Sequence, residues 1–294
     1  MSVSIAYLGP PGTYSEAATL AYVRFFKRKT DTEPLLCAYP SIAQTLQSVA
    51  QGQAHLAVVP VENSIEGSVT ITLDMLWQLD TLQIQQALVL PIRHALLSRA
   101  SSLEAIQTVY SHPQALAQCQ GWLEKFLPSA QLVPANSTTE GLQYLDQDDR
   151  LGVITSQRAA QLYNLPILAS AINDYPDNYT RFWVLGKQLS LGGTHTSLAF
   201  STPANVPGAL VKPLQVFASR AINLSRIESR PTKRSLGEYL FFIDFEADSS
   251  QESVKSALSE LASHTEILKI FGSYGVLAID SSTVLEAGNL KKCD

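Results

Sequence analysis

Residues 4–18 of the chain, SIAYLGPPGTYSEAA, give the first indication of the fold. The apolar run 4–8 predicts a buried strand, and residues 15–28 have the pattern of a helix. Between them, the loop Gly9-Pro10-Pro11-Gly12-Thr13 predicts a tight turn that exposes Thr13 and Ser15. The loop has neither the GxGxxG spacing nor the Lys-Ser/Thr of a nucleotide-binding loop, so a nucleotide site is not indicated.

The same order of strand and helix recurs through the first 190 or so residues. Further apolar runs are 56–59, 108–110 and 151–154, and further helical patterns are 41–51, 69–79, 113–126, 138–145 and 156–162. This alternation predicts an α/β domain with largely parallel sheets. Residues 84–97 are mostly apolar and too long for one ordinary strand, so we expect them to cross into a second lobe and residues 172–185 to lead back.

A different pattern begins after Leu191-Gly192-Gly193-Thr194, which we interpret as a short flexible linker. Strands at 196–201, 224–228, 239–245 and 267–271 and helices at 208–219 and 252–262 follow in the order βαββαβ. This is the order of the ferredoxin-like fold, and it suits a small regulatory module. The predicted domains are therefore 1–190 and 195–274, followed by an unassigned tail, 275–294.

Composition excludes several classes of function. The net charge is −5, only 16% of residues are charged, and no basic stripe is present, so nucleic acid is not an expected partner. No apolar run approaches the length of a membrane span, and the N-terminus lacks the features of a secretory signal, so we expect a cytoplasmic protein. Cys37, Cys119 and Cys293 are too scattered to indicate a disulfide framework or a zinc site. The five histidines lack metal-ligand spacing, so neither a metal nor another cofactor is expected.

Several predicted helices begin with a serine or threonine followed three residues later by glutamate or glutamine. The pairs are Thr13/Glu16, Ser41/Gln44, Ser111/Gln114 and Ser137/Glu140. Each can be a capping box, in which the two side chains satisfy free backbone N–H groups. Helix N-termini at the carboxyl edges of strands favour anions, so the pattern indicates a small carboxylate or phosphate ligand.

Six stretches resemble, in order, the monofunctional prephenate dehydratases that carry a C-terminal ACT domain. They are YLGPPGTYSEAA (7–18), VPVENSIEGSV (59–69), SHPQALAQC (111–119), NYTRF (178–182), GAL (208–210) and IESRP (227–231). The resemblance implies a two-lobed catalytic domain, like that of periplasmic binding proteins, with the active site between the lobes. It implies conversion of prephenate into phenylpyruvate without a cofactor, a homodimer or homotetramer, and feedback inhibition by L-phenylalanine at the ACT domain.

The resemblance also assigns roles to residues of the catalytic domain. Thr180 is expected to donate a proton to the departing hydroxyl, and the catalytic group is Thr180, Asn63, Ser64, Ser111 and Gln118. Thr13 and Ser15 are expected to bind a substrate carboxylate, and Phe182 to form a non-polar wall. For Arg181, binding a carboxylate and pairing with a structural acid are equal alternatives. Glu62 and His112 are expected to be structural.

The remaining assignments concern the ACT domain. The expected phenylalanine site, between two paired ACT domains, consists of Gly208, Ala209, Leu210, Asn223, Leu224, Glu228, Ser229, Arg230 and Pro231. A plainer interpretation is that Ser229-Arg230-Pro231 only ends a strand and that Arg230 is a solvated charge.

Two other functions stay open at this point. An arogenate dehydratase performs the same elimination on a substrate whose keto group is replaced by an ammonium group. A non-catalytic protein that binds small carboxylates would share the two-lobed fold, although the missing secretory signal counts against it.

Overall fold

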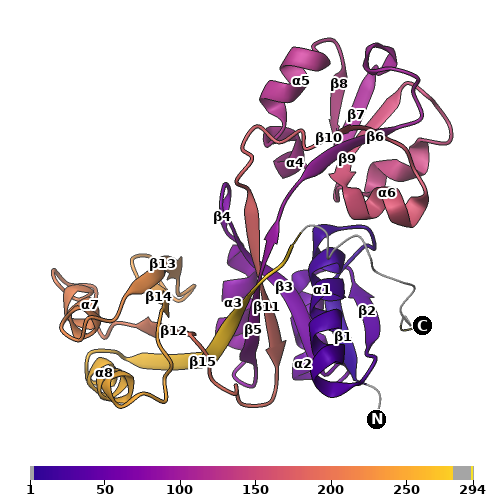
Figure 1. The fold of residues 1–294 in the computed structure, drawn as a ribbon. Helices are drawn as coiled ribbons and strands as arrows, with labels where there is room; N and C mark the ends of the chain where they lie inside the picture. Colours follow the sequence, from indigo (N-terminus) through magenta and orange to yellow (C-terminus); the bar gives the residue numbers. More distant parts are fainter. Residues whose placement is uncertain (1–2, 281–292, 294) are drawn as a thin grey trace.

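The structure is a computed structural model that describes residues 3–280 and 293 of the chain. Figure 1 shows three units: two lobes joined by crossing strands, and a C-terminal unit beside the first lobe. Among the described residues, no helix has both the length and the apolar character needed to cross a membrane.

Lobe 1 is a sheet in the order β5-β11-β3-β1-β2, with β4 paired to β3. Its strands are β1 (Ser4–Leu8), β2 (Leu35–Tyr39), β3 (Leu56–Asn63), β4 (Gly67–Ser68), β5 (Gln83–Pro91) and β11 (Tyr179–Gly186). Its helices are α1 (Tyr14–Thr30), α2 (Ile42–Ala50) and α3 (Thr70–Gln78).

Lobe 2 is a sheet in the order β10-β6-β9-β7-β8. Its strands are β6 (His94–Ser98), β7 (Thr108–Ser111), β8 (Gln131–Pro134), β9 (Leu151–Ser156) and β10 (Ile167–Ser170). Its helices are α4 (Pro113–Ala117), α5 (Gln120–Phe126) and α6 (Gln157–Tyr163), with 3₁₀ turns η1 (Leu103–Ala105) and η2 (Glu140–Tyr144).

The crossing between the lobes was predicted correctly, but the sheets are mixed rather than largely parallel. The chain leaves lobe 1 through β5, enters lobe 2 at β6 and returns through β11. Because β11 returns in the direction opposite to β5, it pairs antiparallel with both β5 and β3. Parallel pairs include β1 with β2 and with β3 in lobe 1, and β7 with β8 and with β9 in lobe 2.

Two helix predictions in lobe 2 need correction. The pattern 113–126 is split at Gln118-Cys119 into α4 and α5. The pattern 138–145 is the 3₁₀ turn η2 instead of an α-helix. Gly141 in this turn lies against Tyr110, where an added Cβ would be 2.6 Å from the Tyr110 Cβ atom. The turn is therefore packed closely onto β7, and the helical periodicity did not indicate this contact.

The C-terminal unit has the predicted βαββαβ order. Its elements are β12 (His195–Ser201), α7 (Val211–Ala218), β13 (Leu224–Pro231), β14 (Tyr239–Phe245), α8 (Glu252–Ser263) and β15 (Ile267–Ala278). Leu198, Phe200 and Ile243 pack under α7 and α8, whereas Ala199 and Phe242 join the core of lobe 1. Since neighbouring side chains of a strand point to opposite faces, both faces of this sheet are buried and the unit is packed firmly against lobe 1.

Strand β15 joins the C-terminal unit to lobe 1. It pairs antiparallel with β12 up to Tyr274 and then parallel with β5 from Gly275 to Ala278, so the first residues of the predicted tail belong to the lobe 1 sheet. The expected flexible linker is also tightly held, because the backbone N–H of Gly193 donates to Asp248 at 2.5 Å and an added Cβ on Gly193 would clash with the Tyr274 backbone. The division at residues 190 and 195 stays a prediction.

The cysteine expectation is wrong for two of the three residues. Cys37 of β2 forms a disulfide with Cys293, with the Cα atoms 5.0 Å apart, while Cys119 is free and buried. The Cys293 N–H also donates to the Leu36 carbonyl oxygen at 2.9 Å. A separation of 256 residues in sequence had suggested unrelated thiols, but folding places them side by side.

Candidate active site

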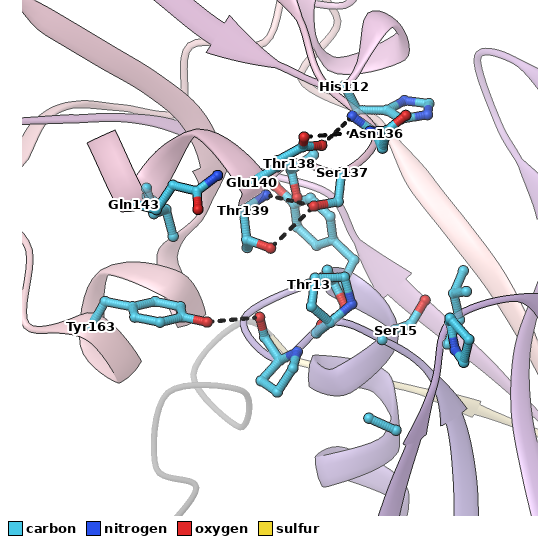
Figure 2. A pocket seen from close by; sticks show the side chains of 18 of the residues that line it. Thr13, Ser15, His112, Asn136, Ser137, Thr138, Thr139, Glu140, Gln143 and Tyr163 are labelled. Atoms are coloured by element: carbon cyan, nitrogen blue, oxygen red, sulfur yellow. Dashed lines mark hydrogen bonds between the residues drawn. The ribbon is translucent and has the colours of Figure 1, made fainter. Parts of the chain in front are cut away.

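A cleft of about 1090 Å³ lies between the two lobes. Figure 2 shows Thr13 and Ser15 of lobe 1 facing His112, Ser137, Thr138 and Tyr163 of lobe 2. The lining is rich in hydroxyl and amide groups, and Arg99 at its edge is already paired with Asp146 at 2.6 Å. The hydroxyl and amide groups of this lining are suited to forming hydrogen bonds with a polar anionic ligand.

The lobe 1 wall is the start of α1. The Thr13 hydroxyl accepts from the Glu16 N–H at 3.4 Å and donates to the Pro10 carbonyl oxygen at 3.0 Å, so the threonine half of the predicted capping box is confirmed. Glu16 accepts from the Gly12 N–H at 2.8 Å and pairs with Arg158 of lobe 2 at 3.4 Å. The buried carboxylate is therefore paired, and its charge opposes an anion in the cleft less strongly.

The other three capping predictions have different outcomes. Ser41 caps α2 by accepting from the Gln44 N–H at 3.2 Å, as predicted. Ser111 does not cap α4, because its hydroxyl donates to the Ile154 carbonyl oxygen at 2.6 Å and His112 occupies the N-cap. Ser137 precedes η2, and its hydroxyl accepts from the Thr139 N–H instead.

The His112 ring is part of the cleft wall as well as the cap of α4. Its nitrogen accepts from the Gln114 N–H at 3.3 Å. Burial lowers the pKa of His112, and the charge of Glu66 opposes this in part. The lowered pKa favours the neutral ring near pH 7, and the structural role of His112 stays a prediction.

A second polar group lies where the crossing strands meet lobe 1. The Asn63 side-chain nitrogen lies 2.9 Å from the Thr180 hydroxyl oxygen and 2.7 Å from the Asn178 side-chain oxygen. The Gln118 oxygen accepts from the Asn178 nitrogen at 2.8 Å. Thr180, Asn63 and Gln118 are not among the residues that line the cleft. Tyr14 lies between the cleft and this second group, because it lines the cleft and bonds to His94 behind it.

Most of the expected catalytic residues are thus gathered here. Ser64 accepts from the Tyr179 N–H at 2.9 Å and stays exposed next to Asn63. Ser111 is separate, with a fully buried hydroxyl bonded to the backbone of β9. Asn178 received no role from the sequence, although it opens the NYTRF stretch two positions before Thr180. Its contacts with both Asn63 and Gln118 make it the centre of the group.

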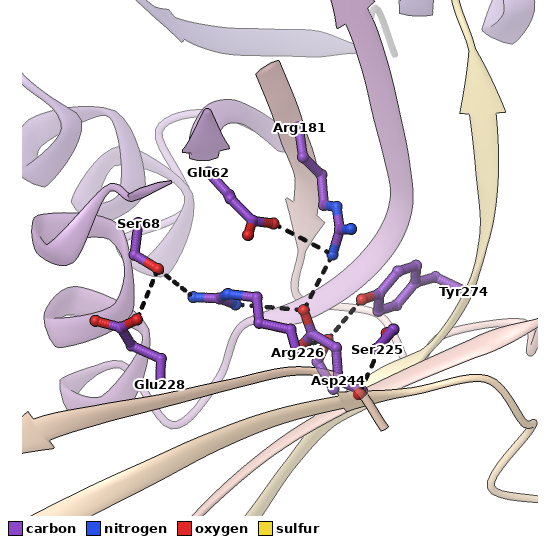
Figure 3. Close-up of polar contacts among 9 residues, drawn as sticks. Glu62, Ser68, Arg181, Ser225, Arg226, Glu228, Asp244 and Tyr274 are labelled. Atoms are coloured by element: carbon purple, nitrogen blue, oxygen red, sulfur yellow. Dashed lines mark hydrogen bonds and ion pairs between the residues drawn. The ribbon is translucent and has the colours of Figure 1, made fainter. Parts of the chain in front are cut away.

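Arg181 and Phe182 lie away from the cleft. Phe182 is 1% exposed in the core of lobe 1. Arg181 pairs with Glu62 at 3.7 Å and with Asp244 of the C-terminal unit at 3.2 Å, as Figure 3 shows. Because successive side chains of a strand point to opposite faces, the Arg181 side chain lies on the face of β11 opposite to the one on which Thr180 contacts Asn63. Of the two alternatives for Arg181, the structure favours the structural pair.

The expected effector residues lie on two parts of the C-terminal unit. Gly208, with φ +82°, and Ala209 line a small cavity of about 370 Å³ before α7, which begins at Val211 rather than Gly208. On β13, Glu228 accepts from Ser68 at 3.0 Å, and Arg230 makes two bonds to Asp74, at 3.0 and 3.1 Å. Arg230 is therefore an ion-pair partner of lobe 1 rather than a solvated charge.

Two further effector positions, Asn223 and Leu224, lie at the start of β13. The Asn223 carbonyl oxygen accepts from the Glu246 N–H at 3.0 Å, and Leu224 packs against the core below α7. Ser229 and Pro231 pair with Phe241 and Tyr239 of β14. Within residues 3–280 and 293, no three His, Cys, Asp or Glu side chains are grouped in a way that could hold a metal ion.

The fold and site define a two-lobed α/β protein with a polar cleft, joined to a βαββαβ unit. The model of the prephenate dehydratase family matches residues 5–190, and that of the ACT domain matches residues 196–263. This chain belongs to the prephenate dehydratase family.

Individual relatives agree with this result. The chain is 42% identical to the bifunctional chorismate mutase/prephenate dehydratase of Aquifex aeolicus, covering 92% of this chain and 73% of that protein. It is 38% identical to the prephenate dehydratase of Methanocaldococcus jannaschii, covering 94% and 99% of the two chains.

Among solved structures, prephenate dehydratase from Arthrobacter aurescens in complex with L-Phe has a TM-score of 0.83 at 35% identity, covering 93% of this chain and 90% of that one. GqqA, described as a quorum-quenching acylase, has a TM-score of 0.78 at 28% identity, with 92% and 97% covered.

Proposed function

We propose that this chain converts prephenate into phenylpyruvate, with loss of carbon dioxide and water, and that L-phenylalanine inhibits it through the ACT domain. Membership of the prephenate dehydratase family supports the reaction. The observation that supports the site most strongly is the orientation of the hydroxyl of Thr180 by Asn63.

The orientation of the Asn63 amide follows from its neighbours. Its oxygen faces the backbone N–H groups of Ile65 and Glu66, at 3.1 and 3.0 Å, and backbone N–H groups can only donate. The Asn63 nitrogen therefore points to Thr180, and its two hydrogens are shared among the Thr180 hydroxyl oxygen, the Asn178 side-chain oxygen and the Tyr179 carbonyl oxygen. The hydroxyl then accepts a hydrogen bond and keeps its own hydrogen for another acceptor, which is what a proton donor needs.

The proposed reaction proceeds as follows. The bond between the ring and its carboxylate breaks, carbon dioxide leaves, and the electron pair enters the ring. The bond between ring carbon 4 and its hydroxyl breaks at the other side, and the departing oxygen takes the proton of Thr180 to form water. Solvent returns a proton to Thr180, and the ring is aromatic.

The second substrate carboxylate, on the pyruvyl side chain, is assigned to the hydroxyl-lined cleft. Thr13 and Ser15 lie at the start of α1, where the helix dipole and free N–H groups favour an anion. Glu16 is paired with Arg158, and the Glu140 carboxylate on the other side of the cleft accepts from the Asn136 N–H at 2.6 Å. In this proposal the substrate ring extends from the cleft past Tyr14 toward Thr180, which itself lies outside the cleft lining.

The proposed regulation has a physical route. Glu228 and Arg230, in the expected effector segment, bond to Ser68 and Asp74 of lobe 1. Arg226 of the same strand and Arg181 of lobe 1 share Asp244, and Arg181 directly follows Thr180. A change in β13 on binding phenylalanine would act on the strand that carries the proton donor.

The activity is tested by mixing the purified full-length chain with prephenate and measuring phenylpyruvate and carbon dioxide. Parallel reactions with arogenate, analysed for phenylalanine, decide between the two substrates. A chain that releases no product from either would contradict the proposal.

Inhibition is best tested with full-length variants. A chain ending near residue 190 would lose β15 and expose one edge of β5, which would keep only β11 as a neighbour. Gly208→Ala and Ser229→Ala should retain turnover and lose sensitivity to phenylalanine, and calorimetry should show weaker phenylalanine binding. We further propose a cytoplasmic homodimer or homotetramer, and light scattering after gel filtration gives the mass. Phenylalanine inhibition that is unchanged in both variants would place the effector elsewhere.

A further inference from the structure

A continuous series of hydrogen bonds runs from the cleft wall to Thr180 through a buried histidine. The Tyr14 hydroxyl lies 3.0 Å from His94 Nδ1, and His94 Nε2 lies 3.0 Å from the Gln118 oxygen. From Gln118 the series continues through Asn178 and Asn63 to Thr180. Tyr14 belongs to α1 of lobe 1, His94 begins β6 of lobe 2, and Asn178 lies on the returning segment, so the series spans the connection between the lobes.

The donor and acceptor of each bond can be assigned from one end. The Asn63 oxygen faces two backbone N–H groups, so the Asn63 nitrogen faces the Asn178 oxygen. The Asn178 nitrogen then faces Gln118, which must present its oxygen. The same oxygen lies 3.0 Å from His94 Nε2, so Nε2 carries a hydrogen and donates. The backbone of Ile65 and Glu66 thereby determines the tautomer of a histidine in the other lobe.

The state of the other ring nitrogen follows from burial. His94 is 3% exposed, and burial lowers its pKa despite the opposing hydrogen bond to Gln118, so the ring is neutral near pH 7. Nδ1 is then an acceptor, and the Tyr14 hydroxyl shares its one hydrogen between this nitrogen and the Arg93 carbonyl oxygen, which lies 2.9 Å away. Burial holds the pKa of Tyr14 well above its ordinary value, which keeps this hydroxyl protonated. The His94 N–H, which bonds to Asn173 at 2.7 Å, holds the backbone beneath the ring.

We infer that His94 is a positioning residue for the reaction, acting as a neutral, Nε2-protonated imidazole that orients Gln118 and, through Asn178 and Asn63, the hydroxyl of Thr180. The inference rests on the proposed function, because it assumes that Thr180 is the proton donor. His94 does not itself line the cleft, which it reaches only through Tyr14, and it reaches Thr180 only through the amides. Its effect should therefore fall on turnover more than on substrate binding.

The first test does not depend on activity. The full-length chain is labelled with ¹⁵N-histidine, and the His94 signals are identified by their loss in His94→Gln. The expected spectrum at pH 7.5 has a protonated Nε2 and an unprotonated Nδ1. A protonated Nδ1 with a bare Nε2, or a charged ring at this pH, would overturn the inference. The same spectrum is informative even if the chain shows no dehydratase activity, which would contradict the proposed function alone.

The second test separates positioning from a merely structural role. His94→Leu removes both ring contacts, and small misplacements of reacting groups cost up to about a hundredfold in rate, so kcat should fall by about tenfold to a hundredfold with little change in KM. His94→Gln places an amide N–H near the position of Nε2 and should recover most of the lost kcat. His55→Gln is the matched control, because His55 bonds to Ser4 at the opposite end of lobe 1 and should have wild-type kcat.

Tyr14→Phe provides a milder perturbation if His94→Leu does not fold. It removes the hydrogen bond to Nδ1 and should lower kcat less than His94→Leu does. Unchanged kcat in both Tyr14→Phe and a folded His94→Leu, or equal losses in His94→Leu and His94→Gln, would refute the positioning role.

Discussion

Asp244→Asn should destabilise the chain and weaken phenylalanine inhibition at the same time. Asp244 is 1% exposed, and its Oδ2 lies 3.2 Å from Arg181 Nη1 and 3.3 Å from Arg226 Nη1, while Oδ1 accepts from Ser197. An asparagine supplies one acceptor oxygen for these donors and carries no charge. Removing one partner of a buried ion pair costs about 3–5 kcal/mol, and the retained oxygen favours the lower figure of about 3 kcal/mol.

The loss can be measured by calorimetry or thermal fluorescence. For a chain of this size, about 1 kcal/mol shifts Tm by roughly 2–4 °C, so Tm should fall by roughly 6–12 °C. The same protein should bind phenylalanine but show weaker inhibition, because Arg181 is no longer held to the ACT domain. Asp148→Asn is the matched control, since Asp148 pairs with Arg150 at the surface, and its Tm should equal that of the wild type. An Asp244→Asn chain with wild-type Tm would refute the energetic argument, and one with lowered Tm but full inhibition would refute the coupling.

Three further predictions concern the proposed donor, the ion pair on α3 and the absence of a cofactor. Thr180→Ala should reduce kcat by about 10²- to 10⁴-fold while Thr180→Ser retains much of it, and a Thr180→Ala enzyme within a few-fold of wild type would contradict the assignment. Burial raises the pKa of Asp74, but hydrogen bonds from Arg230 and Lys233 outweigh this and hold it below its ordinary value. The contribution of the Asp74 carboxylate to stability is therefore present above the ordinary aspartate pKa and is lost as the pH falls through the lowered value. When thermal unfolding is measured between pH 7 and pH 3, Asp74→Asn should lose less stability in acid than the wild type. Identical pH profiles of Tm for the two proteins would contradict this prediction. Turnover of prephenate should survive treatment with EDTA, and loss of activity that a divalent ion restores would contradict a metal-free reaction.

Much of the fold could be predicted because it depends on local patterns. The strand at Ser4–Leu8 and the strand at Tyr239–Phe245 have the predicted bounds, since a run of apolar residues next to a turn or helix start determines them. The second lobe was predicted because the apolar run 84–97 is too long for one ordinary strand. Strands β8 and β10 were missed because each has only four residues and lies at the edge of its sheet. Strand β2 was missed although its sequence, LLCAY, is apolar throughout.

For the candidate site, the sequence predicted some of the residues but not the positions of all of them. Asn63, Gln118 and Thr180 were named through the family resemblance, and the structure brings them together. The positions of Phe182, buried in a core, and Arg181, bonded to the ACT domain, could not be predicted, because a motif names residues without giving the face on which each one lies. His94 and Tyr14 carry no sequence signal of their own, since their importance comes from the groups around them.

The sequence by itself determined the alternation of strands and helices in the first part of the chain, the βαββαβ order of the C-terminal unit, and the family. Those properties depend on periodicity over a few residues and on short motifs in a set order. Only the tertiary structure decided the contacts that join distant segments: Cys37 with Cys293, Asn63 with Asn178, and Ser68 with Glu228. These pairs are 256, 115 and 160 residues apart in sequence. Their formation depends on how β5, β11 and β15 lie next to one another, and that arrangement arises from burying the apolar faces of all three units at once.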